Sequence, residues 1–183
     1  MSRLNHVDPT AAQGETAKLY SQIQRQLGGV PNFMQVLGNS PAALAAFLGF
    51  NGNLSRGSLD PKTRERIALS TAESNACQYC VSAHTALGEK AGLSAAEIAA
   101  ARQAGSEDAR AQAALTFANT VLENRGEVTS AELRAVRDAG FDDAQVVEII
   151  SHVALNALTN FLGKVGQIDI DFPKVDLLAQ VAV

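Results

Sequence analysis

The sequence of 183 residues lacks tryptophan altogether and contains only five prolines and two cysteines, Cys77 and Cys80. One such pair cannot form the framework of a disulfide-stapled secreted domain. Outside that class of protein, cysteines three positions apart indicate redox chemistry or metal binding. The scarcity of proline, together with abundant alanine and leucine, favours a helical fold.

Charged residues are also sparse, at 19% of the chain, and the net charge is −4. No segment is strongly basic, so the electrostatic footprint of a nucleic-acid binder is missing. No apolar run approaches the ~18 residues that span a bilayer, and the first residues lack the apolar stretch of a signal peptide. We therefore expect a soluble, cytoplasmic protein with neither nucleic acid nor membrane as a partner.

Helix start and stop signals divide the first half of the chain into helical segments. A first helix over 12–27 ends at a glycine pair, and a turn follows. Two later helices begin after Ser40 and Asp60, each an N-cap followed by proline at the first helical position. A short break at 75–76 then separates the second of these from a helix over 77–90.

A degenerate repeat with an offset of 35 residues fills the second half. Ser94 and Thr129 are good N-caps, and Glu97 and Glu132 occupy the capping-box position three residues later. Each copy is a short capped helix with a glycine stop, followed by a longer helix. Two copies are too few for a solenoid, so they predict a duplicated helical hairpin inside one domain.

No segment shows the alternation of a strand, and hydrophobic residues make up 46% of the chain, enough for one core. The prediction is therefore an all-α helical bundle, a single domain over 1–183. We expect 1–11 to be mobile. We expect 169–183 to be an extended tail that packs on the domain or on a partner subunit.

The last long helix, over 143–165, combines a strongly apolar side with a polar stripe. Its apolar side is typical of a central or interface helix, so we expect a homo-oligomer. Polar stripes normally face water, and we interpret this one as a solvated or subunit-facing edge. It consists of Gln145, Glu148, His152, Asn156 and Asn160.

The chemistry concentrates on Cys77, Cys80 and His84, with Glu65 on the preceding helix. On a helix the first three fall within one narrow arc. Cysteines at i and i+3 lie close enough for a disulfide, and His84 is placed to take a thiol proton. Because the thiolate is the reactive form of cysteine, such a base activates it. Glu65 shares a helical face with apolar residues and so points inward, where it can exchange protons with a histidine.

The spacing Glu-x11-Cys-x2-Cys-x3-His of these four residues resembles the signature of the alkyl hydroperoxidase D (AhpD)-like proteins, within the carboxymuconolactone decarboxylase superfamily. The turn over 28–32 and the Asp-Ile-Asp-Phe-Pro sequence at 169–173 resemble a longer, peroxidase-related branch. The resemblance spans nearly the whole chain. It implies an AhpD-like bundle and a thiol-dependent peroxidase or disulfide reductase.

Carried over position by position, the resemblance implies that Cys80 is the peroxidatic thiol and Cys77 the resolving thiol. His84 would act as the base, and Glu65 would complete a proton relay. The best-known members have a further histidine just before the second cysteine, where this chain has Tyr79. A phenol donates a hydrogen bond but is a poor base, so Tyr79 is expected to line a pocket or join the relay.

The family further implies a hydroperoxide substrate, no bound cofactor and an external dithiol reductant, either a dihydrolipoyl group or a thioredoxin-like protein. Its members imply a trimer or a hexamer.

The residues themselves leave alternatives open. Helix-end electrostatics favour Cys77 as the attacking thiol, whereas the placement of His84 favours Cys80. A non-enzymatic redox sensor or thiol-exchange protein could use the same disulfide. Zinc could take both cysteines and His84, but a closed structural site requires four ligands, and no second Cys-x2-Cys exists.

Overall fold

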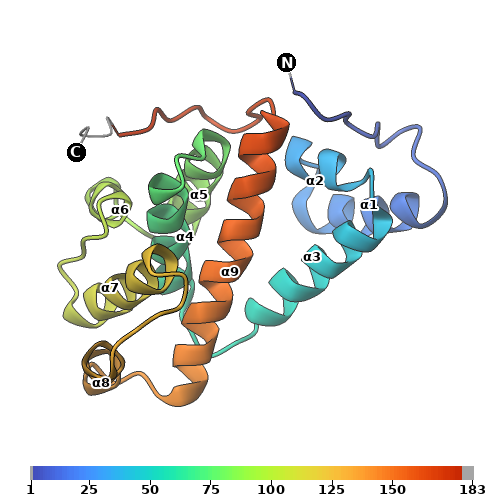
Figure 1. The fold of residues 1–183 in the computed structure, drawn as a ribbon. Helices are drawn as coiled ribbons and strands as arrows, with labels where there is room; N and C mark the ends of the chain where they lie inside the picture. The colour runs from blue at the N-terminus through green and yellow to red at the C-terminus, as the bar shows by residue number, and fades with distance from the viewer. Residues whose placement is uncertain (1, 179–183) are drawn as a thin grey trace.

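Helices account for all the regular structure in the computed structural model, which describes residues 2–178 (Figure 1). This confirms the all-α prediction. In chain order the helices are α1 (Gly14–Leu27), α2 (Asn32–Leu37), α3 (Pro41–Leu54), α4 (Pro61–Ser74), α5 (Gln78–Lys90), α6 (Ala95–Arg102), α7 (Ala109–Glu123), α8 (Ser130–Asp138) and α9 (Asp143–Gly166).

The bundle is arranged around α9, which runs through the middle with α1–α3 on one side and α4–α8 on the other (Figure 1). The helix α4 packs against α5, α6, α7 and α9, so α4 and α9 together form the centre. By length and composition alone α9 could cross a membrane. Core helices meet the same criterion, and α9 contacts α3, α4, α5, α7 and α8.

The capping signals of the sequence are confirmed. The side chains of Ser40 and Asp60 accept hydrogen bonds from backbone N–H groups at the start of α3 and α4. Ser94 and Thr129 each form a complete capping box, so the duplicated hairpin corresponds to α6–α7 and α8–α9. These bonds satisfy N–H groups that a helix start otherwise leaves unpaired.

The short helix α2 stands where the sequence predicts only a turn. Pro31 is its N-cap, and its backbone enters the helix with the φ that the proline ring sets. Phe33, Val36 and Leu37 are buried at helical spacing. The hydrophobic cluster that they join also contains Cys77 and Cys80. Helix α2 therefore forms part of the wall around the cysteines.

Both terminal segments lie along the domain. In the segment predicted to be mobile, the Arg3 N–H donates to the carbonyl of Gly166 over 2.6 Å. In the C-terminal segment, the Val175 N–H donates to Ser82 Oγ over 3.0 Å and the Leu178 N–H to the carboxylate of Glu73 over 2.6 Å. Residues 169–178 of the predicted tail thus pack on α4 and α5, and 179–183 lie outside the described residues.

Tyr79 anchors this tail to the first turn of α5. Its hydroxyl donates to Asp171 Oδ1 over 2.8 Å and accepts from the Phe33 N–H over 3.2 Å. The other oxygen of Asp171 accepts from the Asn32 N–H over 2.7 Å. Burial, followed by the neighbouring Asp171, raises the pKa of Tyr79 well above its ordinary value. The phenol is therefore a fixed donor that ties α2, α5 and the tail together.

Replacing Tyr79 with Phe is expected to lower the free energy of unfolding by about 1–3 kcal/mol, because Asp171 and the Phe33 N–H both lose a partner. Urea unfolding of Tyr79→Phe, Asp171→Ala and the double variant measures the coupling. We expect the double variant to lose less than the sum of the single variants. Strictly additive losses would show that the two side chains do not act as one anchor.

Candidate active site

The cysteine pair is positioned by the sharp turn between α4 and α5. Ala76 has the left-handed φ of 50°, and the Cys77 N–H donates back to the carbonyl of Ala72 over 2.9 Å, which closes the end of α4. Helix α5 starts at Gln78, so Cys77 is its N-cap rather than its first helical residue, one position later than predicted. The Cys77 sulfur accepts from the Cys80 N–H over 3.3 Å.

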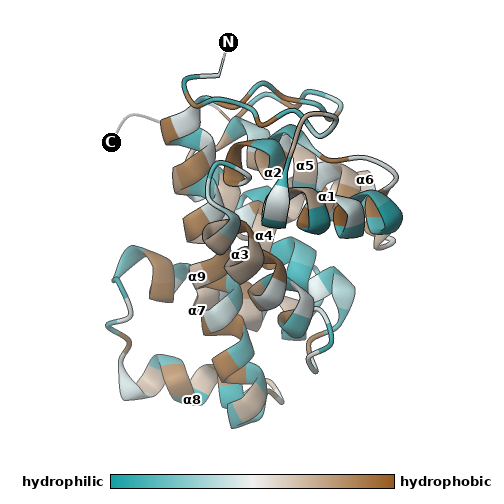
Figure 2. Ribbon diagram, turned by 90° about the vertical axis from the view of Figure 1, so that its right-hand side faces the viewer, coloured by the Kyte–Doolittle hydropathy of each residue, from teal (hydrophilic) through white to brown (hydrophobic). Residues whose placement is uncertain are grey.

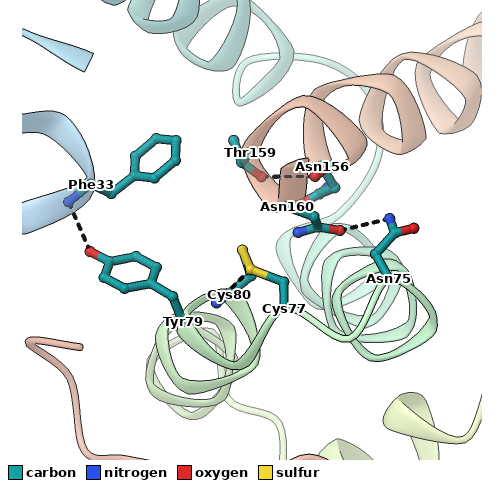
Figure 3. Close-up of a disulfide and its surroundings, with 8 residues drawn as sticks. All are labelled: Phe33, Asn75, Cys77, Tyr79, Cys80, Asn156, Thr159 and Asn160. Atoms are coloured by element: carbon teal, nitrogen blue, oxygen red, sulfur yellow. Dashed lines mark hydrogen bonds between the residues drawn. A yellow bond between two sulfur atoms is a disulfide. The ribbon is translucent and has the colours of Figure 1, made fainter. Parts of the chain in front are cut away.

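The two cysteines form a disulfide with 5.3 Å between their Cα atoms, and both are buried (Figure 3). Helix α9 lies directly against the sulfurs at Gly163. A Cβ at this position would stand 2.9 Å from Cys77 Sγ and 3.6 Å from Cys80 Sγ. Glycine inside a helix costs about 1 kcal/mol relative to alanine, and such a glycine is the signal for a close approach of this kind.

A groove of about 380 Å³ opens beside the pair, and its lining includes Cys77 and Gly163. The Tyr79 and Ile168 side chains supply apolar wall, and Lys164 supplies a positive charge. Within the described chain, Cys77 rather than Cys80 lines this groove. Both cysteines are nevertheless buried, Cys77 at 1% and Cys80 at 2% exposed, so the groove ends beside the pair.

The predicted pair of Glu65 and His84 is formed. His84 Nδ1 lies 2.8 Å from Glu65 Oε2, across the interface of α4 and α5. The two side chains are 21% and 22% exposed, so solvent screens this pair only partly. His84 follows Cys80 by one turn of α5. Because the carboxylate holds Nδ1, Nε2 is the nitrogen that can exchange protons with the site.

Tyr79 lines the groove with its ring, while its hydroxyl is turned toward Phe33 and away from the sulfurs (Figure 3). Its raised pKa keeps the hydroxyl protonated at neutral pH. The structure therefore gives Tyr79 a pocket-lining and anchoring position, one of the two that the sequence left open.

The interpretation of the polar stripe on α9 as a solvated or subunit-facing edge is wrong for three of its members. His152, Asn156 and Asn160 are buried. The helix buries these polar groups together with Val146, Ile149, Val153 and Leu155, and it leaves other apolar residues exposed on its opposite side. The exposed residues are Val147, Ile150, Leu158, Phe161 and Val165.

The buried stripe is incompletely hydrogen-bonded. Asn160 Oδ1 accepts from Asn75 Nδ2 over 2.9 Å, but Asn160 Nδ2 is buried with no partner. Asn156 Nδ2 donates to the carbonyl of His152 over 2.8 Å, and His152 Nε2 is a second buried orphan. An unsatisfied buried polar group costs about 1–3 kcal/mol, so each orphan requires an explanation.

His152 belongs to the electrostatic surroundings of the predicted relay. Its pKa is lowered from 6.5 to about 4, first by burial and second by the positive charge of Arg64. Glu148 and Glu65 act in the opposite direction. The imidazole of His152 is therefore neutral at pH 7. It is a polar but uncharged group in the surroundings of Glu65 and His84.

A zinc site is not assembled here. Within residues 2–178 no three side chains of His, Cys, Asp or Glu come close enough together to hold a metal ion. The described residues thus provide no fourth ligand, and no such group contains Cys77, Cys80 and His84.

Residues 41–124, which contain the four predicted site residues, match the model of the carboxymuconolactone decarboxylase family. The chain is 31% identical over 113 residues to an alkyl hydroperoxide reductase of Mycobacterium tuberculosis. That match covers 60% of this chain and 32% of the relative. The matched part thus spans about a third of the length of that protein.

Solved structures with the same fold extend the comparison over almost the whole chain. A peroxidase-related protein from Ralstonia eutropha JMP134, described as an AhpD core, is 26% identical with a TM-score of 0.84, covering 93% of this chain and 92% of that one. A peroxidase-related protein from Silicibacter sp. TM1040 is 24% identical with a TM-score of 0.77, covering 92% and 94%. The debrominase Bmp8 is 16% identical with a TM-score of 0.76, covering 92% of each chain, and shares the fold alone.

The buried His152 makes stability depend on pH in a way that can be measured. Because its pKa is lower in the folded state than in the unfolded chain, the unfolded chain binds the proton first as pH falls below 6.5. Stability is therefore lost between about pH 6.5 and pH 4. The free energy of unfolding of the wild type should fall between pH 7 and pH 4.5. In His152→Gln this fall should be smaller by roughly 2 kcal/mol.

Urea unfolding at the two pH values measures this difference. His6→Gln, in the N-terminal segment, is the control and should follow the wild type. Identical pH dependence in His152→Gln and the wild type would contradict the buried neutral imidazole.

Proposed function

Because the chain is an AhpD-like protein of the carboxymuconolactone decarboxylase superfamily, we propose that it reduces organic or hydrogen peroxides with its own cysteine pair. One observation carries the proposal: Cys77 and Cys80 are at disulfide distance, and His84, one helical turn after Cys80 on α5, is hydrogen-bonded to Glu65 on α4. The family and this pair already indicate a peroxidase-related thiol function. The proposal assigns the steps and the residues.

In the first step Cys80 is the nucleophile. His84 Nε2 takes the Cys80 proton, and Glu65 stabilises the imidazolium through Nδ1. The thiolate attacks the distal oxygen of the hydroperoxide, the O–O bond breaks, and the oxygen stays on sulfur as a sulfenic acid. The alkoxide takes the proton from His84 and leaves as an alcohol, or as water when the substrate is hydrogen peroxide.

In the second step Cys77 resolves the sulfenic acid. Its thiolate attacks Cys80 Sγ, the S–O bond breaks, and hydroxide leaves as water with the Cys77 proton. The N-cap position supports this role, because the Cys80 N–H and the positive end of α5 stabilise a thiolate on Cys77. The product is the disulfide present in the structure.

In the third step an external dithiol restores the pair. The groove beside Cys77 favours attack of the dithiol on Cys77 Sγ, which forms a mixed disulfide and releases Cys80 as a thiolate near His84. The second thiol of the reductant then displaces Cys77. We propose a dihydrolipoyl group or a thioredoxin-like protein as the reductant, no bound cofactor, and the cytoplasm as the compartment in which such reductants act.

The exposed apolar face of α9 supports the proposed homo-oligomer. Exposed apolar residues recur every three or four positions along one side of this helix, at Val147, Ile150, Ala154, Leu158, Phe161 and Val165. The hydrophobic colour of α9 in Figure 2 marks its apolar composition. Soluble proteins rarely leave such a continuous apolar surface in water. A second copy of the chain is the partner that we propose for it, in a trimer or hexamer.

The function is tested by peroxide consumption with cumene hydroperoxide and dihydrolipoamide. The wild type should turn over repeatedly, whereas Cys80→Ser should consume no peroxide. Cys77→Ser should consume one equivalent per chain and carry a sulfenic acid on Cys80. His84→Gln keeps both sulfurs and should slow the reaction by about 10²–10⁴-fold.

Sulfenic acid on Cys77 in the Cys80→Ser variant, with no reaction in Cys77→Ser, would reverse the assignment of the two thiols. A disulfide that forms in the wild type without turnover would assign the chain to redox sensing or thiol exchange instead.

The oligomer is tested by light scattering of wild type and Phe161→Glu at micromolar concentration. We expect the buried charge to dissociate the wild-type assembly, because an unpaired carboxylate in an apolar interface is strongly unfavourable. Arg134→Glu on α8, also an exposed residue, is the control and should leave the assembly intact. A wild-type protein that is strictly monomeric would contradict the proposal.

A further inference from the structure

The unpaired amide of Asn160 is a buried polar group, on the helix that contacts the disulfide, that the proposed cycle does not use. Asn160 has no exposed surface, and its Nδ2 has no hydrogen-bond partner among the described residues. Native proteins pair nearly all such donors, and those that remain unpaired in one state call for a partner in another. The search for that partner starts from what surrounds the side chain.

Asn160 is held in a defined orientation. Asn75, at the end of α4, donates from Nδ2 to Asn160 Oδ1 over 2.9 Å. That bond turns the oxygen toward α4 and leaves the Nδ2 hydrogens on the opposite side of the amide. Figure 3 shows Asn160 beside the disulfide, with its nitrogen on the side of the sulfurs and its oxygen on the side of Asn75.

The backbone of α9 places this amide at the sulfurs. Gly163 follows Asn160 by three residues and so lies on the same face of the helix. It is the residue whose missing Cβ lets α9 approach Cys77 Sγ and Cys80 Sγ. The amide therefore lies on the buried face of α9 that contacts the sulfurs, one turn before the contact itself.

The oxidised pair is a poor partner for this donor. Disulfide sulfurs are neutral and only weak acceptors, whereas a thiolate is an anion that accepts a charge-assisted hydrogen bond. A donor that is unpaired beside the disulfide gains its partner when the pair is reduced and one thiol ionises. Neither sulfur accepts from Asn160 Nδ2 in the oxidised pair, so the bond forms when a reduced cysteine side chain turns toward the oriented amide.

We propose that Asn160 is a further residue of the active site, whose Nδ2–H donates a hydrogen bond to the cysteine thiolate of the reduced pair. It thereby favours the thiolate over the thiol, and Asn75 acts through it as a positioning residue. This proposal rests on the proposed function in one respect: the cysteine pair must be reducible to a dithiol.

Other groups around the pair also influence the ionisation of the thiols. They come from α4, α5, α9 and the C-terminal segment, and all stay unchanged when Asn160 is replaced. These groups are Glu65, Tyr79, His84, His152, Lys164 and Asp171.

The test is the pH dependence of iodoacetamide alkylation of the fully reduced protein. We expect Asn160→Leu, which keeps the shape of the side chain and removes its donor, to raise the pKa of the more acidic thiol by about one unit. Alkylation near neutral pH should then slow by up to about tenfold. Asn160→Asp should raise this pKa at least as much, because a carboxylate would face the thiolate.

Asn156→Leu is the matched control, since Asn156 is also a buried amide on α9 but donates to the carbonyl of His152. It should lower stability and leave the thiol pKa unchanged. Asn75→Ala leaves Asn160 in place without its orienting bond and should raise the pKa by a smaller amount. This variant keeps the question answerable if the buried substitutions prevent folding.

A thiol pKa that is the same in folded Asn160→Leu and in the wild type would overturn the proposal, as would an equal rise in Asn156→Leu. The measurement needs no peroxide, so its outcome is independent of peroxidase turnover. A raised pKa in a protein without turnover would refute the proposed function and keep the role of Asn160.

Discussion

The direct contact between α9 and the cysteine pair is the constraint on which the rest of the structure depends. At Gly163 the helix lies so close to the sulfurs that a Cβ would stand only 2.9 Å from Cys77 Sγ. The same helix buries Asn160, one turn before Gly163, and His152, whose pKa responds to the charges of Glu65 and His84. The apolar residues on the opposite side of the helix then face outward, where a second copy of the chain can cover them.

The same contact explains the one-sided access to the sulfurs. Helix α9 closes the pair from one direction, α2 and the Tyr79–Asp171 anchor close it from another, and the groove that remains leads to Cys77. His84, the base that we propose for Cys80, lies one turn further along α5 and is hydrogen-bonded to Glu65 on α4. In the proposed cycle the peroxide reacts at Cys80 and the external dithiol at Cys77.

Local chemistry made much of this predictable from the sequence. N-caps at Ser40 and Asp60 and the boxes at Ser94 and Thr129 fix helix starts with their own side chains, so those boundaries agree with the structure. The spacing of Cys77, Cys80 and His84 likewise places them on one side of the first two turns of α5. Helix α2 was missed because its six residues are stabilised by burial of Phe33, Val36 and Leu37 rather than by local signals.

The orientation of α9 was missed because periodicity defines the faces of a helix but not which face the tertiary structure buries. The proposed role of Asn160 follows only from that orientation, because the sequence alone does not show that its side chain is buried on the face of α9 that contacts the sulfurs.

The central claim is that the chain is oxidised stoichiometrically by a hydroperoxide through one cysteine pair. The most direct test is titration of the fully reduced, metal-free protein with cumene hydroperoxide, followed by intact mass and by residual peroxide. The account predicts consumption of one peroxide per chain, with loss of two hydrogens and an endpoint at one equivalent. Thiols that stay reduced while the peroxide remains in solution would contradict it.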